Sequence, residues 1–354
     1  MAISMTTPTQ SNALPRTPGA PPPMQMMEML YGALATQLIS VAAEYGIADL
    51  LCEGPRPVAD LAAGSGTHPG ALYRVLRALA GLGVFAEVAP GVFGLTPLAE
   101  TLRGGVSGSM KEIAQDVGGR TRLLAYAELS HSLRTGQPAF DHAHGMGMWP
   151  YLRDHPDEVA LFSRAMGNLA SQAHSAAFAV HDLSDVRCLV DVGGGEGHLV
   201  AAVLPRYPDL RAIVFDEPHV TRGADRVLAD AGLTGRVDIV GGNVFEAVPE
   251  GGDAYVLSSI LFSYEDEDAG TILTNIRRVL TSNGRVLVLE PVLSTGNDPH
   301  PGKLLDVCQL ALHRGGVRTE TEWLALLDSA GFRLAEMKRM WPSSPTDLIV
   351  AVPA

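Results

Sequence analysis

A glycine-rich run between a predicted strand and a predicted helix constrains the fold of this chain most strongly. The run reads DVGGGEG over residues 191–197 and directly follows apolar residues. Glycines permit a tight turn and let a ligand approach the backbone closely, and the helix that follows directs its N-terminus at that ligand. The spacing G-x-G-x-G is not the dinucleotide fingerprint G-x-G-x-x-G, and no Gly-Lys-Ser/Thr follows, which excludes a P-loop.

An acidic residue ends the next predicted strand. Asp216 closes the segment Val214-Phe215-Asp216, where a carboxylate can accept hydrogen bonds from a ribose diol. Alternatively, the same residue could cap the following helix. Because both features lie at the carboxyl ends of adjacent strands, together they favour a site for a cofactor that contains a ribose.

Short β-branched segments alternate with helical segments from residue 187 onward. Buried parallel strands are predicted at 188–192, 211–215, 237–240, 254–257 and 285–289, with helical crossovers between most of them. The last two predicted strands, 333–340 and 347–352, are joined by a short Pro-Ser loop and predict an antiparallel hairpin. We therefore expect a doubly wound α/β sheet that ends in an antiparallel hairpin.

The front of the chain has a different pattern. Apolar residues recur at helical spacing over 24–51, with a break expected at Gly46, and the methionines at the start are typical of an adaptable packing surface more than of a cofactor site. Helices at 58–63 and 69–82 followed by a hairpin at 85–94 predict a winged helix-turn-helix. Residues 110–180 are predicted to be mostly helical.

Charge and composition limit the classes of partner. The net charge of -13 disfavours nucleic acid and anionic membranes, and the 69–82 helix offers only Arg74 and Arg77 as basic residues, so DNA binding by this winged helix is disfavoured. The composition, 46% hydrophobic and 18% charged, is that of a soluble globular protein, and no apolar run was expected to span a membrane. The three dispersed cysteines argue against a disulfide framework and fit a reducing cytoplasm.

Seven segments, including the glycine-rich run and the strand that ends in Asp216, carry a family resemblance when they are taken together. They are 191–197, 214–216, 242–245, 253–257, 290–291, 318–323 and 330–332. With them the chain, over roughly residues 25–354, resembles the small-molecule S-adenosylmethionine-dependent O-methyltransferases of the plant caffeate type and their bacterial natural-product relatives. The resemblance implies a class I methyltransferase fold behind a mostly helical, winged-helix-like dimerisation domain. It also implies S-adenosylmethionine or S-adenosylhomocysteine as cofactor.

The resemblance and the patterns above predict four segments. Residues 1–23 form a disordered tail, 24–104 the winged-helix-like dimerisation domain, 105–180 a helical linker and substrate-pocket region, and 181–354 the S-adenosylmethionine-binding Rossmann-like domain. A homodimer is expected, because the front segment has more apolar helical surface than its own small core can cover.

The resemblance also implies cofactor-binding residues. Gly193 and Gly195 would lie under the methionine part, Asp216 on the ribose, and Asn243 with Val244 at the adenine, where Asn243 replaces the family's acid but still offers an acceptor. Phe162 and Met166 would lie beside the sulfonium, although such an i,i+4 pair is more often ordinary helix core. The full predicted set is Asp191, Gly193, Gly195, Asp216, Glu217, Asn243, Val244, Ser258, Phe162 and Met166.

The predicted catalytic region departs from the family. Glu290 and Glu320 match two carboxylates that flank the catalytic histidine, but Phe262 occupies the histidine position and Ser263 the neighbouring aspartate. A phenyl ring cannot accept a proton, and a positioned base usually contributes about 10²–10⁴-fold. His313 is a candidate replacement, with a solvated or capping histidine as the alternative. The predicted substrate pocket contains Trp149, Phe262 and Asp306.

No metal site is expected. The acidic run 265–268 precedes a helix and suits its first turn, and the spacing of His142, His144, His174 and His313 does not match a metal-ligand set.

Two functions follow from this sequence. The first is methyl transfer to an oxygen of an aromatic or polyketide-like small molecule in natural-product biosynthesis. The second keeps the cofactor as a fixed positive charge and supports hydroxylation, decarboxylation, cyclisation or rearrangement; Phe262 and Ser263 favour it. A DNA-binding regulator is a third possibility, which the charge disfavours.

Overall fold

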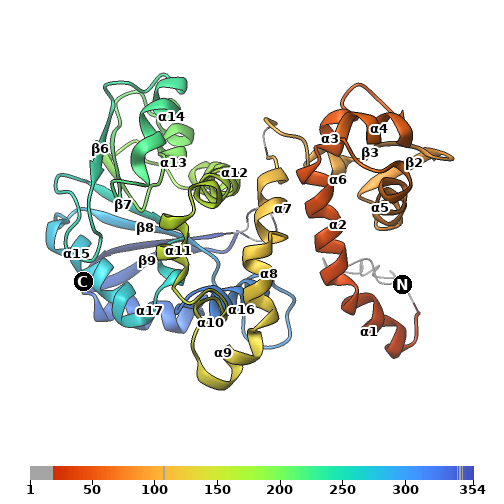
Figure 1. Cartoon of the computed structure of the whole chain (residues 1–354). Coiled ribbons are helices and arrows are strands. Elements are labelled where there is room, and N and C mark those ends of the chain that lie inside the picture. The colour runs from red at the N-terminus through yellow and green to blue at the C-terminus, as the bar shows by residue number, and fades with distance from the viewer. Residues whose placement is uncertain (1–18, 107, 341, 343, 345) are drawn as a thin grey trace, which may run out of the picture. The chain divides into compact units, whose positions relative to one another are not determined.

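A computed structural model describes residues 19–354 except 107, 341, 343 and 345, with only the backbone described for 169–175. The chain divides into two compact units, one ending at Gly118 and including Asn297–Pro299, the other comprising Gly119–Gly296 and His300–Ala354 (Figure 1). Most of the predicted tail lies outside the described residues. Its last two residues are not tail, because Pro22 already begins helix α1 (Pro22–Leu30), where proline suits the first helical turn.

The first unit contains the predicted helices and hairpin. Its further helices are α2 (Gly32–Glu44), α3 (Ile47–Leu50), α4 (Val58–Ser65), α5 (Pro69–Gly81), α6 (Pro97–Glu100) and α7 (Lys111–Val117). Strands β1 (Arg56–Pro57), β2 (Phe85–Ala89) and β3 (Val92–Leu95) form a sheet in the order β1-β3-β2. Gly46 breaks the helical stretch as predicted, in a left-handed conformation with φ 62°. A second break, at Tyr31, was not predicted.

Helices α1 and α2 leave an apolar surface uncovered. Met27, Leu30 and Leu34 are each about half exposed or more. The stretch Pro22–Glu44 is long and apolar enough to cross a membrane: its most apolar 18-residue window has a mean hydropathy of 1.3, and 22% of that window is buried. This corrects the expectation that no apolar stretch reaches that length. Length and composition alone do not distinguish a membrane span from an apolar helical surface that another protein covers.

The second unit is built on a seven-stranded sheet in the order β6-β5-β4-β7-β8-β10-β9. The strands are β4 (Cys188–Val192), β5 (Arg211–Asp216), β6 (Val237–Gly241), β7 (Ala254–Ser258), β8 (Arg285–Glu290), β9 (Phe332–Lys338) and β10 (Asp347–Pro353). The first five are parallel, and β10 runs antiparallel to both β8 and β9. The predicted doubly wound sheet with a C-terminal hairpin is therefore confirmed.

Helices cover both faces of this sheet (Figure 1). Leu189 of β4 packs in one apolar layer with α12 (Pro156–Val180), α13 (His198–Val203) and α14 (Ala224–Asp230). The next residue, Val190, packs in the opposite layer with α15 (Asp266–Val279) and α17 (Glu320–Ser329). Successive residues of a strand point to opposite faces, so a strand covered on both faces is apolar along its length.

The remaining helices of the second unit form a separate apolar cluster. They are α8 (Arg120–Ala127), α9 (Leu129–Thr135), α10 (Ala139–His144), α11 (Met148–Asp154) and α16 (Gly302–Leu312). Ala125, Phe140 and Leu312 are buried at the centre of this cluster, and Phe162 of α12 packs against it. Short 3₁₀ turns lie at η1 (Leu204–Arg206), η2 (Thr221–Gly223) and η3 (Leu261–Ser263).

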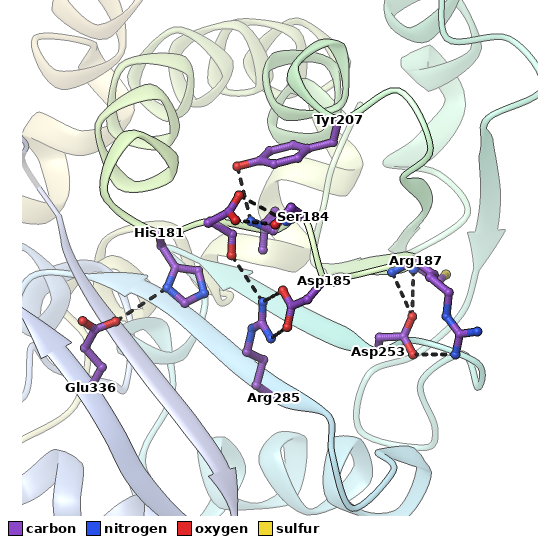
Figure 2. Close-up of polar contacts among 11 residues, drawn as sticks. His181, Ser184, Asp185, Arg187, Tyr207, Asp253, Arg285 and Glu336 are labelled. Atoms are coloured by element: carbon purple, nitrogen blue, oxygen red, sulfur yellow. Dashed lines mark hydrogen bonds and ion pairs between the residues drawn. The ribbon is translucent and has the colours of Figure 1, made fainter.

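Polar contacts fix the link between α12 and the sheet (Figure 2). The guanidinium of Arg285 donates to both carboxylate oxygens of Asp185, each at 2.7 Å. Asp253 accepts hydrogen bonds from the backbone N–H groups of Arg187 and Cys188 at 3.0 and 3.1 Å. These contacts hold the segment that leads from α12 into β4 at the edge of the sheet opposite the glycine-rich turn.

Candidate active site

The glycine-rich turn lies between β4 and α13. Two of its glycines are required for different physical reasons. Gly193 and Gly195 both have left-handed backbones, with φ 73° and 59°, which only glycine adopts without strain. A Cβ at Gly193 would lie 2.4 Å from Cδ1 of Ile260. A Cβ at Gly195 would meet no atom within 4 Å, so that side of the turn is open to a ligand.

Asp216 is tied to this turn. Its Oδ2 accepts a hydrogen bond of 2.9 Å from the Gly195 N–H, and its Oδ1 accepts one of 2.7 Å from the Glu217 N–H. Burial raises the pKa of the Asp216 carboxyl, while these two donors oppose the shift. The strand-end acid and the glycine turn are therefore in direct contact, as their positions in the sequence predict.

Asp191 is buried beside Asp216. Burial, with the charge of Asp216, raises the pKa of Asp191 to about 8. Its Oδ2 is buried and has no hydrogen-bond partner among the described residues, an arrangement that costs free energy. S-adenosylmethionine carries positive charge and hydrogen-bond donors. The carboxylate pair and the open side of Gly195 therefore fit that cofactor.

We expect cofactor binding to release a proton from Asp191. The raised pKa, about 8, keeps this carboxyl protonated at pH 6.5 in the free protein, and a cationic ligand favours the ionised form. Calorimetry at pH 6.5 in buffers of different ionisation enthalpy should show release approaching one proton for the native chain and none for Asp191→Asn. A native heat that does not depend on the buffer would show that cofactor binding does not ionise Asp191.

The predicted adenine-side residues lie after β6. Oδ1 of Asn243 accepts a hydrogen bond of 3.0 Å from the Phe245 N–H, and its Nδ2 donates to Glu246 at 3.2 Å. The carbonyl of Val244 accepts from Asn275 at 2.9 Å. Asn243 thus shapes its own turn at the same sheet edge as Asp216, as short polar side chains commonly do.

Two further predicted cofactor residues also lie at strand ends. Glu217 directly follows β5, and its carboxylate lies 3.2 Å from Nδ1 of His219. Ser258 ends β7. The next residue, Ser259, has φ 58° and is the only non-glycine residue with positive φ in the described part of the chain. Backbone strain of this kind persists only where the surroundings impose it.

Helix α12 lies against the beginning of α13. A Cβ at Gly167, the residue after Met166, would lie 2.7 Å from the ring of His198, the residue that directly follows the glycine-rich turn. Phe162, one helical turn earlier, contacts Trp149 edge-on, with ring centroids 5.9 Å apart. Met166 and Phe162 are both half-buried, so they are not ordinary fully packed core.

Glu290 supports the segment that contains Phe262. The carboxyl is buried, and its Oε1 accepts hydrogen bonds from the N–H groups of Ile260, Leu261 and Phe262. Burial raises the pKa of Glu290 to about 7, against the opposing effect of Arg318. Every hydrogen bond described for this carboxyl is to backbone, so the geometry shows Glu290 as a support of η3.

Arg318 completes this support from the other side. Its guanidinium donates to the carbonyls of Leu261 and Tyr264 at 2.9 Å each, and to Asp266 at 2.9 Å. Glu320 lies exposed in the first turn of α17, where an acid suits the helix dipole. No hydrogen bond or ion pair among the described residues joins Glu320 to Glu290.

The predicted substrate residues come together in part. The rings of Trp149 and His313 stack with centroids 5.0 Å apart and an interplanar angle of 27°. Oδ1 of Asp306 accepts a hydrogen bond of 2.8 Å from the Val317 N–H, so Asp306 anchors the loop that follows His313. That loop reaches Phe262, because a Cβ at Gly315 would lie 2.2 Å from the Phe262 carbonyl oxygen.

The acidic run forms the start of α15, with Glu265 as N-cap. This confirms the helix-start interpretation. Among the described residues no group of three or more His, Cys, Asp or Glu is placed to hold a metal ion.

Four residues at the site were not predicted. Ile260 fills the space against Gly193, His198 packs on Gly167, and Gly315 approaches the backbone of η3. Arg318 was noted only as part of a matching segment. The pair Gly315-Gly316 was a usable signal for a close approach, whereas the other contacts join residues far apart in the chain.

Two family models match this chain. An O-methyltransferase domain matches residues 126–333, and an O-methyltransferase dimerisation domain matches residues 27–104. The chain is 39% identical over 309 residues to phenazine O-methyltransferase PhzM of Lysobacter antibioticus, covering 87% of this chain and 90% of that protein. It is 35% identical over 336 residues to aclacinomycin 10-hydroxylase RdmB of Streptomyces purpurascens, covering 90% and 88%.

A solved structure shows the same architecture. The O-methyltransferase NcsB1 from neocarzinostatin biosynthesis, in complex with S-adenosylmethionine and 2-hydroxy-5-methyl naphthoic acid, has a TM-score of 0.75 and 31% identity to this chain, covering 90% of this chain and 96% of that one.

Proposed function

Because the chain belongs to the S-adenosylmethionine-dependent O-methyltransferase family, we propose that it transfers a methyl group to an oxygen atom of an aromatic or polyketide-like natural product. The contact between Asp216 and the Gly195 N–H, beside an open face of the turn, is the observation that carries this proposal. The dimerisation domain indicates a homodimer. We place the enzyme in the cytoplasm, in keeping with its three free cysteines.

We assign roles to the site residues on this basis. Gly193 and Gly195 hold the methionine part of the cofactor, with Asp191 facing its positive charge; Asp216 and Glu217 hold the ribose, and Asn243 with Val244 the adenine. Ser258 borders the cofactor at the end of β7. Phe162 and Met166 lie beside the sulfonium, and Trp149, Phe262 and the loop anchored by Asp306 receive the acceptor. Residues 24–104 serve dimerisation, 105–180 are a helical linker that contributes to the acceptor pocket, and 181–354 form the cofactor-binding domain together with the rest of that pocket.

The proposed mechanism depends on positioning more than on a base. The sulfonium of the bound cofactor supplies an electrophilic methyl group. The chain's own task is to hold the acceptor oxygen in line with that methyl, and effective molarities from positioning reach about 10⁵–10⁸ M. Phe262 provides no proton acceptor, and Glu290 is committed to the backbone of η3. The acceptor is therefore an acidic phenol or a carboxylic acid that reacts as its own anion.

A second candidate function retains the cofactor but transfers no methyl group. The 35% identity to a protein named as a hydroxylase favours it, as does Phe262 at the position of the family's base. In that case the sulfonium acts as a fixed positive charge beside the reacting substrate.

We expect methyl-labelled S-adenosylmethionine, incubated with the enzyme and an extract of the producing cells, to yield a labelled product with an equal amount of S-adenosylhomocysteine. Phe262→His should retain or raise this activity, because it adds a base to a reaction that proceeds without one. Substrate turnover with no label transferred would exclude methyl transfer and support the second candidate.

A further inference from the structure

His313 lies against Trp149 in a defined geometry. The residue directly follows α16, and its backbone N–H donates to the Gln309 carbonyl at 2.7 Å. Its ring covers one face of the Trp149 indole, with centroids 5.0 Å apart and planes 27° from parallel. Phe162 meets the same indole edge-on at 76°. Trp149 nevertheless remains 38% exposed, so part of its surface is free for another ring.

The loop after His313 fixes the position of this ring pair. A Cβ at Gly315 would lie 2.2 Å from the Phe262 carbonyl oxygen and 2.3 Å from the Tyr264 nitrogen. Two residues later, the Val317 N–H is bound to Asp306. His313 and Trp149 are thereby held beside the segment in which the family has its base.

The surroundings of His313 keep its ring neutral. Burial, with the positive charge of Arg122, lowers its pKa to about 3. Arg122 also acts on Tyr126, one turn further along the same face of α8, whose side chain packs in the cluster with Leu312. Arg314, the next residue, lies 3.8 Å from Asp141. A neutral imidazole stacks on an indole as another aromatic ring would.

Resting on the proposed methyl transfer, we propose that His313 is a positioning residue: its ring braces Trp149 as the wall against which a planar, fused-ring hydroxyaromatic acceptor stacks. An indole is bicyclic, so a bicyclic acceptor stacked on it overlaps a larger area than a single ring does. His313 acts through Trp149 and takes no proton from the acceptor. The bracing role takes the place of the hypothesis that His313 is a replacement catalytic base.

The binding test uses 3-hydroxy-2-naphthoate and the single-ring 4-hydroxybenzoate as probes, with the dimeric protein saturated with S-adenosylhomocysteine. Calorimetry should show that the native chain prefers the naphthoate. His313→Ala should weaken naphthoate binding by roughly 2- to 10-fold, the range for loss of an aromatic pair, and His313→Phe should restore it. His155→Ala is the matched control, because His155 also stacks on an aromatic residue, Tyr151, with ring centroids 3.8 Å apart, and neither ring has a described ring contact with Trp149.

A second measurement separates a wall from a base. The NMR signal of the His313 imidazole is identified as the one that is missing in His313→Phe. In the native chain the chemical shift of this signal should not change between pH 5 and pH 8. Titration near the ordinary histidine value of about 6.5 would overturn the proposal. So would failure of phenylalanine to rescue, or equal affinity of the native chain for both probes. These experiments measure acceptor binding and do not depend on methyl transfer. If the protein binds the naphthoate through His313 but transfers no methyl group, only the proposed function is rejected.

Discussion

Asp216→Ala is expected to weaken S-adenosylmethionine binding by roughly 10²- to 10⁴-fold, the effect of losing two hydrogen bonds of about 1.5–3 kcal/mol each to a charged acceptor. The carboxylate lies at the end of β5 and already binds the Gly195 N–H at 2.9 Å, so its removal affects both the proposed ribose contact and the glycine turn. Gly195→Val should be at least as severe. The valine side chain would enter the open space beside the turn. Valine would also have to adopt the left-handed backbone of this position, φ 59°, which is strained for any residue with a Cβ.

Calorimetry with purified dimer measures both variants. Asp238→Ala is the matched control, because this aspartate lies on neighbouring β6 in an exposed ion pair of 4.0 Å with Arg211, and exposed pairs contribute little. Native-like affinity in either Asp216→Ala or Gly195→Val would show that the cofactor lies elsewhere.

Gly315→Ala is expected to destabilise the protein by about 3 kcal/mol and to abolish acceptor binding, since overpacking of a filled site typically costs about 1–3 kcal/mol and sometimes more. The added Cβ would lie 2.2–2.5 Å from three backbone atoms of residues 262–264. Backbone cannot rotate away as a flexible side chain can. Glu290 and Arg318 also hold this segment from both sides, so the loop carrying His313 must move instead.

Thermal unfolding and probe binding together test this. Gly270→Ala is the control, because its Cβ would meet only Leu326 at 3.9 Å, and alanine is favoured over glycine in a helix by about 1 kcal/mol. We expect the control to melt at or slightly above the native temperature and Gly315→Ala several degrees below it. Equal melting temperatures for the two variants would mean that the loop does not pack on η3 as described.

The strands of the second unit were predictable because their signals are local. Five β-branched runs were placed within one residue of β4–β8, and the hairpin of β9 and β10 within two. A strand covered on both faces needs apolar residues along its whole length. Such a strand can therefore be recognised from a run of consecutive apolar residues. The contact of Asp216 with the glycine turn was predictable for a related reason, because parallel strands bring their carboxyl ends to one edge.

Helix boundaries in the first unit were harder to predict from the sequence than the strands of the second unit. Gly46 was expected to break the opening helix and does so with a left-handed backbone, whereas the break at Tyr31 has no proline or glycine at that position to mark it. The methionines of α1 are predicted to form an adaptable packing surface, and in the structure they are about half exposed. The exposed fraction of each side chain depends on the tertiary packing and could not be predicted from the residue types.

The sequence by itself determined the doubly wound sheet and the glycine turn, because each depends on residue types in short, continuous segments. Only the tertiary structure decided that Glu290 binds the backbone of η3, that Asp306 anchors a loop, and that His313 stacks on Trp149. These are contacts between residues far apart in the chain. Which residues meet in such contacts depends on how the helices and strands pack, and this cannot be predicted from a local pattern of residues.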